Sequence, residues 1–575
     1  MREESIPCVC IIDAGGQYTK VIDRRIRELQ VRSEILSPAT EIAVLKTFSA
    51  IIISGGPSSV TDENAPKLSA EILNMNIPVL GICWGMQFIN HVNGGKVVAL
   101  EKREDGVFPI TVVNTASELF KGLPETQEVL LTHGDSITKA IGKDRVKCLH
   151  IDNGFMRKGE SEQVIKSLTD IGTPVELVNA QRMFYNSSCQ IYGSKPEDLL
   201  QEPSQILCKT IDPEQKRKII GDTFIKLVKI EANRRNLSID NTDVFLAQGT
   251  LRPDLIESAS ATVSSHADVI KTHHNDSPMA RQYRNAGRLV EPLRDFHKDE
   301  VRRLGTRLGL PESIVKRQPF PGPGLAIRVI CADNFLVQED EGPAPLLKML
   351  SNYSHCLKTP HTLLEKIKSS LSSSEHDRLE KFTRDAKLYT SILPIKSVGV
   401  QGDCRSYSQV ACISGPPMWT ELVFLAKIIP RICHTINRVC YLMGTPIRDS
   451  HFPNDTTPTT LSEYPLSQLR ECDHRANTIM KKHNQLDNVS QMPVVLLPLH
   501  FDREPYSTKV GSCQRSVVIR PFISSDFMTG RAAIPGQDLS EECVNEMQKE
   551  LCEVPGITRL LYDLTSKPPG TTEWE

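Results

Sequence analysis

Apolar residues near the start of the chain occur in short runs separated by amphipathic stretches. Four runs predict strands, at Cys8–Asp13, Val31–Leu36, Ala50–Ser54 and Val79–Ile82. The stretch after the first run would form a helix whose apolar face consists of Tyr18, Ile22, Ile26 and Leu29. Strands that alternate with helices predict a parallel, doubly wound α/β sheet.

A second α/β pattern begins near Val146. It predicts strands at 147–151, 175–178 and 244–247, with helices at about 160–170 and 216–233 between them. A Pro/Gly-rich segment at 319–324 ends this pattern. From about Ala326 onward, predicted strands alternate with long polar helices. We therefore expect three domains, at 1–142, 143–328 and 329–575, the last of them α+β.

Composition narrows the class of protein. The 575 residues are 39% hydrophobic and 24% charged, with 68 basic against 70 acidic residues. This balance argues against a protein that coats nucleic acid or an anionic membrane, and no apolar run approaches the roughly 18 residues of a membrane span. The sixteen cysteines show no zinc-type spacing and no secretory signal is visible, so we expect reduced thiols, no metal site and a cytosolic location.

The pentapeptide Gly81-Ile82-Cys83-Trp84-Gly85 lies where an apolar strand meets a helix. It is the cysteine version of the nucleophile elbow, in which glycines permit a sharp turn and the helix N-terminus favours a thiolate. A buried structural thiol beside two turn glycines is the alternative. Ser54-Gly-Gly-Pro57 ends the preceding strand and predicts either a second oxyanion donor or an ordinary turn.

Several motifs in a fixed order resemble those of a known family. Asp13–Tyr18, Ser54–Pro57, Gly81–Gln87 and Leu131–Ser136 look like a flavodoxin-like class I glutamine amidotransferase domain. The downstream chain is similar to the synthetase half of GMP synthases, which is an adenine nucleotide α-hydrolase-like (PP-loop ATPase) domain followed by a dimerisation domain. The stretches that carry this resemblance are Ile151–Arg157, Lys216–Thr223, Phe245–Asp254, Ile270–Asn275, Pro319–Arg328 and Lys567–Glu575. The long insert between Cys404 and Gln514 resembles that of the animal-type enzymes.

The resemblance implies a ligase that makes GMP from XMP, ATP and ammonia cut from glutamine. Cys83 would attack the glutamine amide and form a thioester, with the N–H groups of Gly56 and Trp84 as the oxyanion hole. ATP would adenylate the purine O2, which ammonia then displaces. The XMP-binding residues implied by the family pattern are Arg217, Asp403, Gln491, Lys567 and Glu573.

The resemblance also implies ATP-binding residues, namely Gln248, Gly249, Thr250, His273, His274 and Lys298. Paired histidines can equally be packing residues, and Lys298 would belong to a lid. ATP would enter as its Mg²⁺ complex, without a permanent cofactor. The expected partners are XMP, ATP, glutamine and a second copy of the chain, with neither a membrane nor a nucleic acid.

Two catalytic features of the family are absent from the sequence. No His-x-Glu pair occurs, although this pair supplies the general base of the amidotransferase. No Ser-Gly-Gly-x-Asp-Ser loop (the PP-loop) occurs to cradle the ATP pyrophosphate. Both would fall between Ser136 and Val146, where only a linker fits. The sequence therefore predicts sheets that lack strands, and poor stability.

Three explanations remain open. The sequence could come from a gene model or transcript that skips exons, it could be a non-catalytic form that binds XMP or dimerises, or it could be an enzyme with substitute residues. A tRNA-modifying relative of the same nucleotide-binding superfamily is disfavoured by the nearly neutral charge.

Overall fold

The computed structural model describes most of the 575-residue chain. The ranges outside the described residues are 1–7, 17–18, 57, 63–64, 112–125, 139–145, 192–201, 236, 238–243, 252–282, 295, 297, 334–341, 402–403, 449–451, 504–511 and 525–528. The chain divides into two compact units, of which the first is Met1–Lys147 with 307–309 and the second is the remainder. No helix among the described residues is long and apolar enough to cross a membrane.

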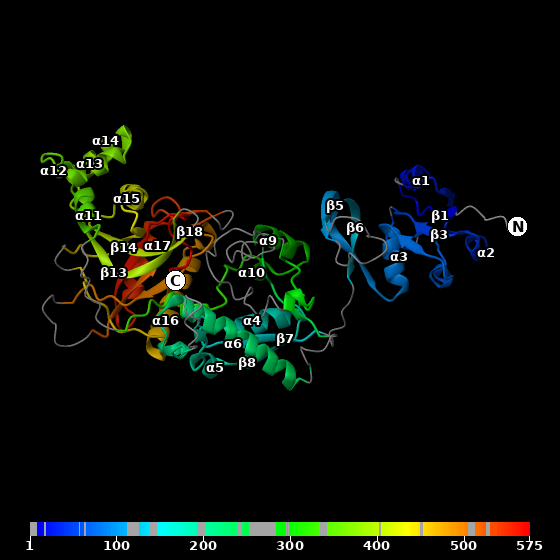
Figure 1. Ribbon diagram of the computed structural model, residues 1–575, viewed down its shortest axis with the longest axis horizontal. Helices are drawn as coiled ribbons and strands as arrows, with labels where there is room; N and C mark the ends of the chain where they lie inside the picture. The colour runs from blue at the N-terminus through cyan, green and yellow to red at the C-terminus, as the bar shows by residue number, and fades with distance from the viewer. Residues whose placement is uncertain are drawn as a thin grey trace. The chain divides into compact units, whose positions relative to one another are not determined.

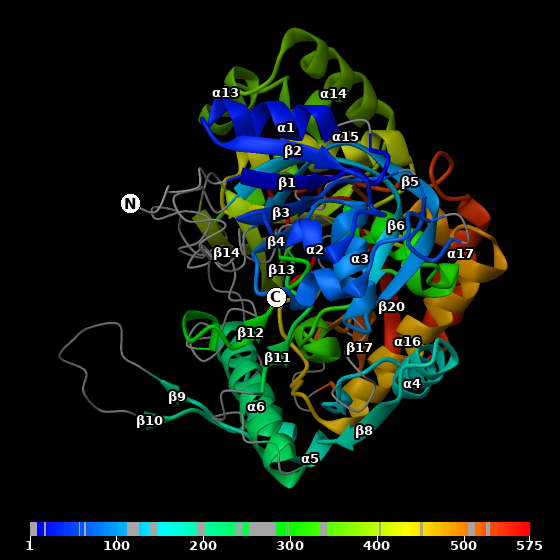
Figure 2. The same ribbon diagram turned by 90° about the vertical axis from the view of Figure 1, so that its right-hand side faces the viewer.

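The N-terminal unit contains a sheet of four parallel strands in the order β2-β1-β3-β4 (Figure 2). Its elements are β1 (Cys8–Ile12), α1 (Thr19–Glu28), β2 (Arg32–Leu36), α2 (Ile42–Leu45), β3 (Ala50–Ile53), a 3₁₀ turn (Ala70–Asn74), β4 (Val79–Gly81), α3 (Trp84–Val92), β5 (Lys96–Thr111) and β6 (Thr126–Thr138). The parallel α/β sheet confirms the predicted fold class. Strands β5 and β6 form a separate antiparallel pair.

The predicted apolar face of the first helix is only partly right. Helix α1 ends at Glu28, and Leu29, which follows it, is 76% exposed. Ile22 and Ile26 are half-buried, and Tyr18 lies outside the described residues. The helix therefore contributes less apolar surface to the core than its sequence pattern predicts, because its fourth apolar position lies beyond its last turn.

The second unit begins with two separate pairs of parallel strands, β7 with β8 and β11 with β12. The long helix α6 is labelled beside β7 and β8 in Figure 1, and the labels of β11 and β12 stand near its own in Figure 2. The elements of this part are β7 (Cys148–Asp152), α4 (Glu160–Asp170), β8 (Val175–Asn179), α5 (Gln181–Tyr185), β9 (Gln190–Ile191), β10 (Glu202–Pro203), a 3₁₀ turn (Leu207–Lys209), α6 (Pro213–Arg234), β11 (Leu246–Ala247), β12 (Leu289–Val290), α9 (Lys298–Arg307), α10 (Glu312–Val315) and the 3₁₀ turn η5 (Gly324–Arg328).

A six-stranded mixed sheet forms the centre of the C-terminal half, in the order β13-β14-β15-β20-β17-β16. A cluster of short helices precedes it, at the upper left of Figure 1. The elements are α11 (Ala344–Ser351), α12 (Tyr353–Cys356), α13 (Thr362–Ser369), α14 (Ser373–Asp385), β13 (Tyr389–Gln401), β14 (Cys404–Ser414), α15 (Trp419–Ile432), β15 (Ile436–Leu442), α16 (Glu463–Lys482), a 3₁₀ turn (Leu486–Asn488), β16 (Val494–Leu497), β17 (Arg515–Ile519), β18 (Phe522–Ile523), β19 (Arg531–Ala532), α17 (Glu541–Cys552) and β20 (Ile557–Asp563).

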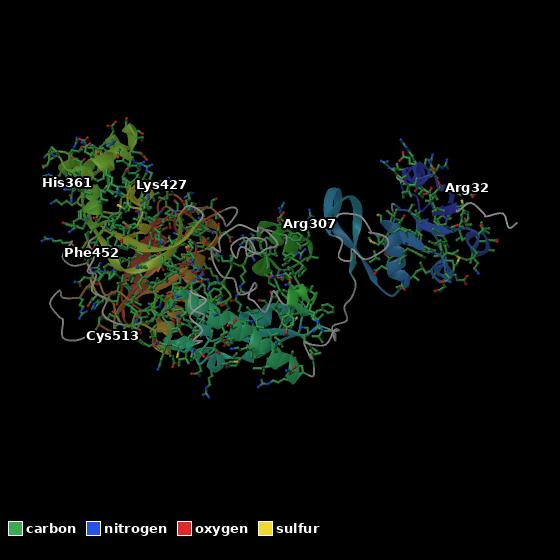
Figure 3. The ribbon with its side chains drawn as sticks, in the orientation of Figure 1. Arg32, Arg307, His361, Lys427, Phe452 and Cys513 are labelled. Atoms are coloured by element: carbon green, nitrogen blue, oxygen red, sulfur yellow. The ribbon has the colours of Figure 1, made fainter. Side chains whose placement is uncertain are left out.

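This sheet is buried on both faces. Alternate residues of β15 divide between two apolar clusters, with Val439 and Tyr441 in one and Cys440 and Leu442 in the other. Helices α15, α16 and α17 contribute to the first cluster. Trp574 contributes to the second, as does Phe452, labelled in Figure 3, from the loop after β15. The last residues of the chain are therefore part of the core.

Candidate functional site

Cys83 has the strained backbone of a nucleophile elbow. It connects β4 to α3 with φ 52° and ψ −106°, in a region that residues other than glycine rarely adopt. Strain of this kind costs about 1–3 kcal/mol and persists where the surroundings impose it, often at functional sites. Its partly exposed thiol stands at the N-terminus of a nine-residue helix, where the dipole favours a thiolate.

The flanking glycines explain how this turn fits. A Cβ on Gly81 would lie 2.5 Å from the backbone of Gly85, and a Cβ on Gly85 would lie 2.4 Å from the carbonyl oxygen of Ile53. Only glycine allows β3, β4 and the start of α3 to approach so closely. The Gly-x-Cys-x-Gly spacing is therefore required by the geometry of the turn.

The loop after β3 lies beside the thiol. A Cβ built on Gly55 would be 3.3 Å from the Cβ and 3.8 Å from the Sγ of Cys83. Ser54, which is buried, fixes this loop because its hydroxyl accepts a hydrogen bond of 3.0 Å from the Ala14 N–H. Gly56 packs against Ala14, whose carbonyl oxygen would be 2.4 Å from an added Cβ. The loop that contains Gly56 therefore lies beside Cys83, next to the side chain of the elbow residue.

Trp84, the other predicted oxyanion donor, is the first residue of α3, so its backbone N–H has no acceptor within the helix. Its ring is 1% exposed and stacks on Phe88 with a centroid distance of 5.6 Å. Within the described residues its indole N–H has no hydrogen-bond partner. The side chain anchors the helix start, which leaves the backbone as the group available to a ligand.

A second group of predicted residues gathers around the end of the chain. Arg217 on α6 is 6% exposed and donates a hydrogen bond to the backbone carbonyl of Glu575. The neighbouring Lys216 is fully buried, with its Nζ 2.7 Å from Glu575 Oε2 and 3.0 Å from the Val329 carbonyl oxygen. Burial raises the pKa of Glu575, whereas the Lys216 ammonium opposes that rise. The start of α6 is thus fixed to the chain end.

Arg405 on β14 belongs to the same group, although the sequence analysis did not identify it. It pairs with Glu214, and its guanidinium lies 4.9 Å from the ring centroid of Tyr407. Burial and the positive charge of Arg405 both lower the pKa of Arg217. Within the described residues the Nε atoms of both arginines are buried without a hydrogen-bond partner. Two adjacent cations with unused donors favour an anionic ligand, such as a phosphate.

A signal for Arg405 exists in the sequence. It follows the predicted Asp403 by two residues, and alternate residues of a strand share one face. The same face carries Tyr407. Asp403 itself lies outside the described residues.

Gln491, Lys567 and Glu573 attach to neighbouring segments. Gln491 Nε2 donates to the Pro319 carbonyl oxygen over 3.3 Å, and its backbone bridges to Phe522 in β18. Strand β18 pairs with β19, and Gly530 beside β19 bridges to the backbone of Lys567. Glu573 is 8% exposed and forms a two-point ion pair with Arg328. Gln491 and Lys567 are therefore attached to the short strands β18 and β19, and Glu573 belongs to the tail.

The predicted ATP-binding residues are placed in part. Gln248, Gly249 and Thr250 directly follow β11, and the Gln248 N–H donates to the Val290 carbonyl oxygen over 2.9 Å. The Thr250 hydroxyl donates to Glu291 over 2.6 Å. Burial alone would raise the pKa of Glu291, but hydrogen bonds from Arg284 and Thr250 lower it. Thr250 therefore already has a structural partner.

Lys298 begins α9 and is partly exposed. His273 and His274 lie outside the described residues. Four of the six predicted ATP-binding residues, Gln248, Gly249, Thr250 and Lys298, are therefore among the described residues.

Known proteins match this chain along nearly its whole length. The family model "Glutamine amidotransferase class-I" matches residues 10–165, and "GMP synthase C terminal domain" matches 478–574. A Caenorhabditis elegans protein described as "Probable GMP synthase [glutamine-hydrolyzing]" is 39% identical over 701 aligned positions, which cover 99% of this chain and 92% of that protein. The Dictyostelium discoideum "GMP synthase [glutamine-hydrolyzing]" is 38% identical over 697 positions, covering 98% and 94%.

The length of the first alignment adds a fact about this chain. Its 701 positions exceed the 575 residues of the chain by 126. At least that many positions of the worm protein therefore have no counterpart here.

Proposed function

The chain belongs to the family of glutamine-hydrolysing GMP synthases, and we propose that it forms GMP from XMP, with glutamine as the nitrogen donor and ATP as the activating nucleotide. The observation that carries this proposal is Cys83, whose positive φ at a helix N-terminus is the geometry of an activated nucleophile. Its thiolate would attack the glutamine amide and release ammonia from a tetrahedral intermediate. The Gly56 and Trp84 N–H groups would stabilise the oxyanion.

The paired arginines support the XMP half of the proposal. Arg217 and Arg405 offer buried guanidinium Nε donors beside the tail, and a phosphate monoester could accept hydrogen bonds from both. Glu573 and Gln491 supply acceptors and donors for the ribose or the base. Lys567 and Asp403 would complete the set by family resemblance.

For ATP, we propose that the loop of Gln248, Gly249 and Thr250 approaches the nucleotide, together with His273, His274 and Lys298. Support comes from its place after a parallel strand, where nucleotides bind in α/β folds, and from the buried Gln248 Oε1, which lacks a hydrogen-bond partner among the described residues. ATP would bind as its Mg²⁺ complex. By the same resemblance we propose a cytosolic homodimer formed through residues 329–575.

A second candidate is an XMP-binding or dimerising protein without catalysis. It is favoured by the sequence, which has neither a His-x-Glu pair nor a Ser-Gly-Gly-x-Asp-Ser loop, and by the 126 or more aligned positions without a counterpart. Cys83 without its general base would form and resolve the thioester slowly. The residues proposed to bind XMP, in contrast, are all present in the sequence.

One experiment separates the two candidates. GMP formation is measured with XMP, Mg-ATP and either glutamine or ammonium, for the full chain and for Cys83→Ala, and XMP binding is measured by calorimetry. A synthase loses glutamine-dependent but not ammonium-dependent synthesis in Cys83→Ala. Equal synthesis by both proteins with glutamine would remove Cys83 from the site. XMP binding without GMP from either nitrogen source would establish the second candidate.

A further inference from the structure

Ser54 connects the elbow turn to the loop after β3. The residue directly follows β3 and is fully buried. Its carbonyl oxygen accepts a hydrogen bond of 3.2 Å from the Gly85 N–H, in the first turn of α3. Its hydroxyl donates a hydrogen bond of 2.9 Å to the carbonyl oxygen of the next residue, Gly55. One buried serine thus contacts both the turn that holds Cys83 and the loop beside it.

The Ser54 hydroxyl is itself held by the loop after β1. Its oxygen accepts a hydrogen bond of 3.0 Å from the Ala14 N–H and lies 3.2 Å from the hydroxyl of Thr19, which is buried at the start of α1. Thr19 Oγ1 also lies 2.9 Å from Asp13 Oδ1. A serine hydroxyl has one hydrogen to donate, and the Gly55 carbonyl oxygen is a nearer acceptor than Thr19 Oγ1. These contacts give the Ser54 hydroxyl one favoured direction.

The peptide bond between Gly55 and Gly56 needs such a constraint, because neither residue has a Cβ to limit its backbone angles. The Gly55 carbonyl oxygen faces the loop after β1, since a Cβ on Gly16 would lie 2.4 Å from it. The peptide is trans, so the Gly56 N–H points in the opposite direction, away from that loop. Rotation of the peptide by half a turn would put the carbonyl oxygen where the N–H is.

This peptide adjoins the elbow residue. A Cβ on Gly55 would lie 3.3 Å from the Cβ of Cys83. In the part of the chain that the structure describes, the Gly56 N–H donates no hydrogen bond to the protein. An N–H group in this place can stabilise a developing oxyanion, whereas a carbonyl oxygen would repel it. The orientation of one peptide bond therefore affects the chemistry proposed for the thiol.

We propose that Ser54 is a positioning residue for the oxyanion donor. Its hydroxyl holds the Gly55 carbonyl towards the loop after β1 and so keeps the Gly56 N–H available to an oxyanion. This inference rests on the proposed function of Cys83 and Gly56. Ser54 acts on the oxyanion and not on the thiolate, so reactions of Cys83 that form no oxyanion should not depend on Ser54.

The test compares two electrophiles at Cys83 in the full chain, with mass spectrometry of the peptide that contains it. In a glutamine chloroketone a chloromethyl ketone replaces the amide, so its carbonyl oxygen requires the oxyanion donors while the thiolate forms a C–S bond and chloride leaves. Iodoacetamide alkylates the same thiolate, with loss of iodide, without that requirement. We expect Ser54→Ala to slow the chloroketone reaction by about 10- to 100-fold, and the iodoacetamide reaction by less than about 2-fold.

Ser33→Ala is the matched control. Ser33 lies on β2 of the same sheet, where its hydroxyl donates a hydrogen bond of 2.7 Å to Asp23 Oδ1. The variant therefore removes a serine hydrogen bond from the same unit without changing the loop after β3. Both alkylation rates should stay within about 2-fold of those of the unchanged chain.

The outcomes separate the inference from its premise. If the chloroketone reacts with Cys83 no faster than with the other thiols of the chain, the proposed function of Cys83 fails. A selective reaction that Ser54→Ala leaves unchanged would overturn the positioning role alone. Equal slowing with both electrophiles, or an equal loss in Ser33→Ala, would show a merely structural role and overturn the inference.

A second variant covers the case in which Ser54→Ala does not fold. Thr19→Val removes the hydroxyl beside Ser54 Oγ and leaves Ser54 in place. Because the Ser54 hydroxyl would then be less constrained, the chloroketone reaction should slow by about 3- to 10-fold, with no change in the iodoacetamide reaction. An unchanged chloroketone rate in Thr19→Val would overturn the inference.

Discussion

Two sets of apolar strands in the second unit reach very different degrees of burial. All seven residues of β15 are buried, as are all residues of β16 and β17. In β7 every residue is only half-buried, Leu177 in β8 is 50% exposed, and Val290 in β12 is 44% exposed. Strand β7 (CLHID) and strand β17 (RSVVI) each have three apolar residues in five, so composition alone does not explain the contrast between them.

Packing on both faces of the strands explains it, since even β16, an edge strand with one strand neighbour in its sheet, lies fully buried between the two apolar clusters. Strand β15 has β14 on one side and β20 on the other, with an apolar cluster on each face. In the part of the chain that the structure describes, β7–β8 and β11–β12 remain two separate pairs without a third strand. An isolated pair of strands is marginally stable in water. An apolar sequence therefore predicts a strand, but the strand is buried only where other elements pack against it.

The largest expected effect is a difference in hydrogen exchange between these two regions. Backbone amides of β15 and β20 should open only with global unfolding, whereas those of β7 and β8 should open locally. We expect protection factors that differ by at least about 10³, or roughly 4 kcal/mol. Exchange of the full chain measured by mass spectrometry provides the comparison, with the strands of the N-terminal sheet as an internal reference. Equal protection of β7 and β15 would contradict the comparison.

Sequence reasoning located local features well and distant contacts poorly. The Cys83 turn could be predicted because its glycines and its strand–helix junction lie within five residues. Arg217 was expected to bind a ligand, but its contact with Glu575 joins residues 358 positions apart, which no local pattern reveals. The Arg328–Glu573 pair is similar, with 245 positions between its members. The spacing of Arg405 from Asp403 was a local signal, but its burial depends on tertiary pairing, which the sequence does not reveal.

The next largest effect on stability should come from Asp563, whose carboxylate balances the charge of buried arginines in the C-terminal core. It is fully buried, 2.8 Å from Arg438 and 3.0 Å from Arg520, and accepts a hydrogen bond of 3.0 Å from the Trp574 indole. Asp563→Asn leaves two buried cations uncompensated, which should cost about 3–5 kcal/mol. Denaturant unfolding followed by the fluorescence of the three tryptophans measures this loss. The exposed pair of Arg24 and Glu28 is the control, and Glu28→Gln should change stability by less than about 1 kcal/mol.

The same residue predicts a dependence on pH. Burial by itself would raise the pKa of Asp563, but the two guanidiniums hold that pKa below the ordinary value of 3.8. Because the folded-state pKa is depressed, the stabilisation is complete above about pH 3.8 and is lost as the pH falls through the lower folded-state value. Asp563→Asn should therefore remove part of the acid sensitivity of the C-terminal core. An unchanged acid transition in this variant would contradict the assignment.

The smallest expected effect makes the comparison sharpest, because it uses one substitution at two sites. Leu561 in β20 is fully buried and Leu177 in β8 is half-exposed. Leu561→Ala should cost about 2–5 kcal/mol, since it removes buried methyl groups and leaves a cavity. Leu177→Ala should cost less than about 1 kcal/mol, because much of that side chain already contacts water. Local exchange in β8 and in β20 measures each change where it occurs. If the two losses were equal, β8 would be as well packed as β20, and β7–β8 would not need a further strand to be buried.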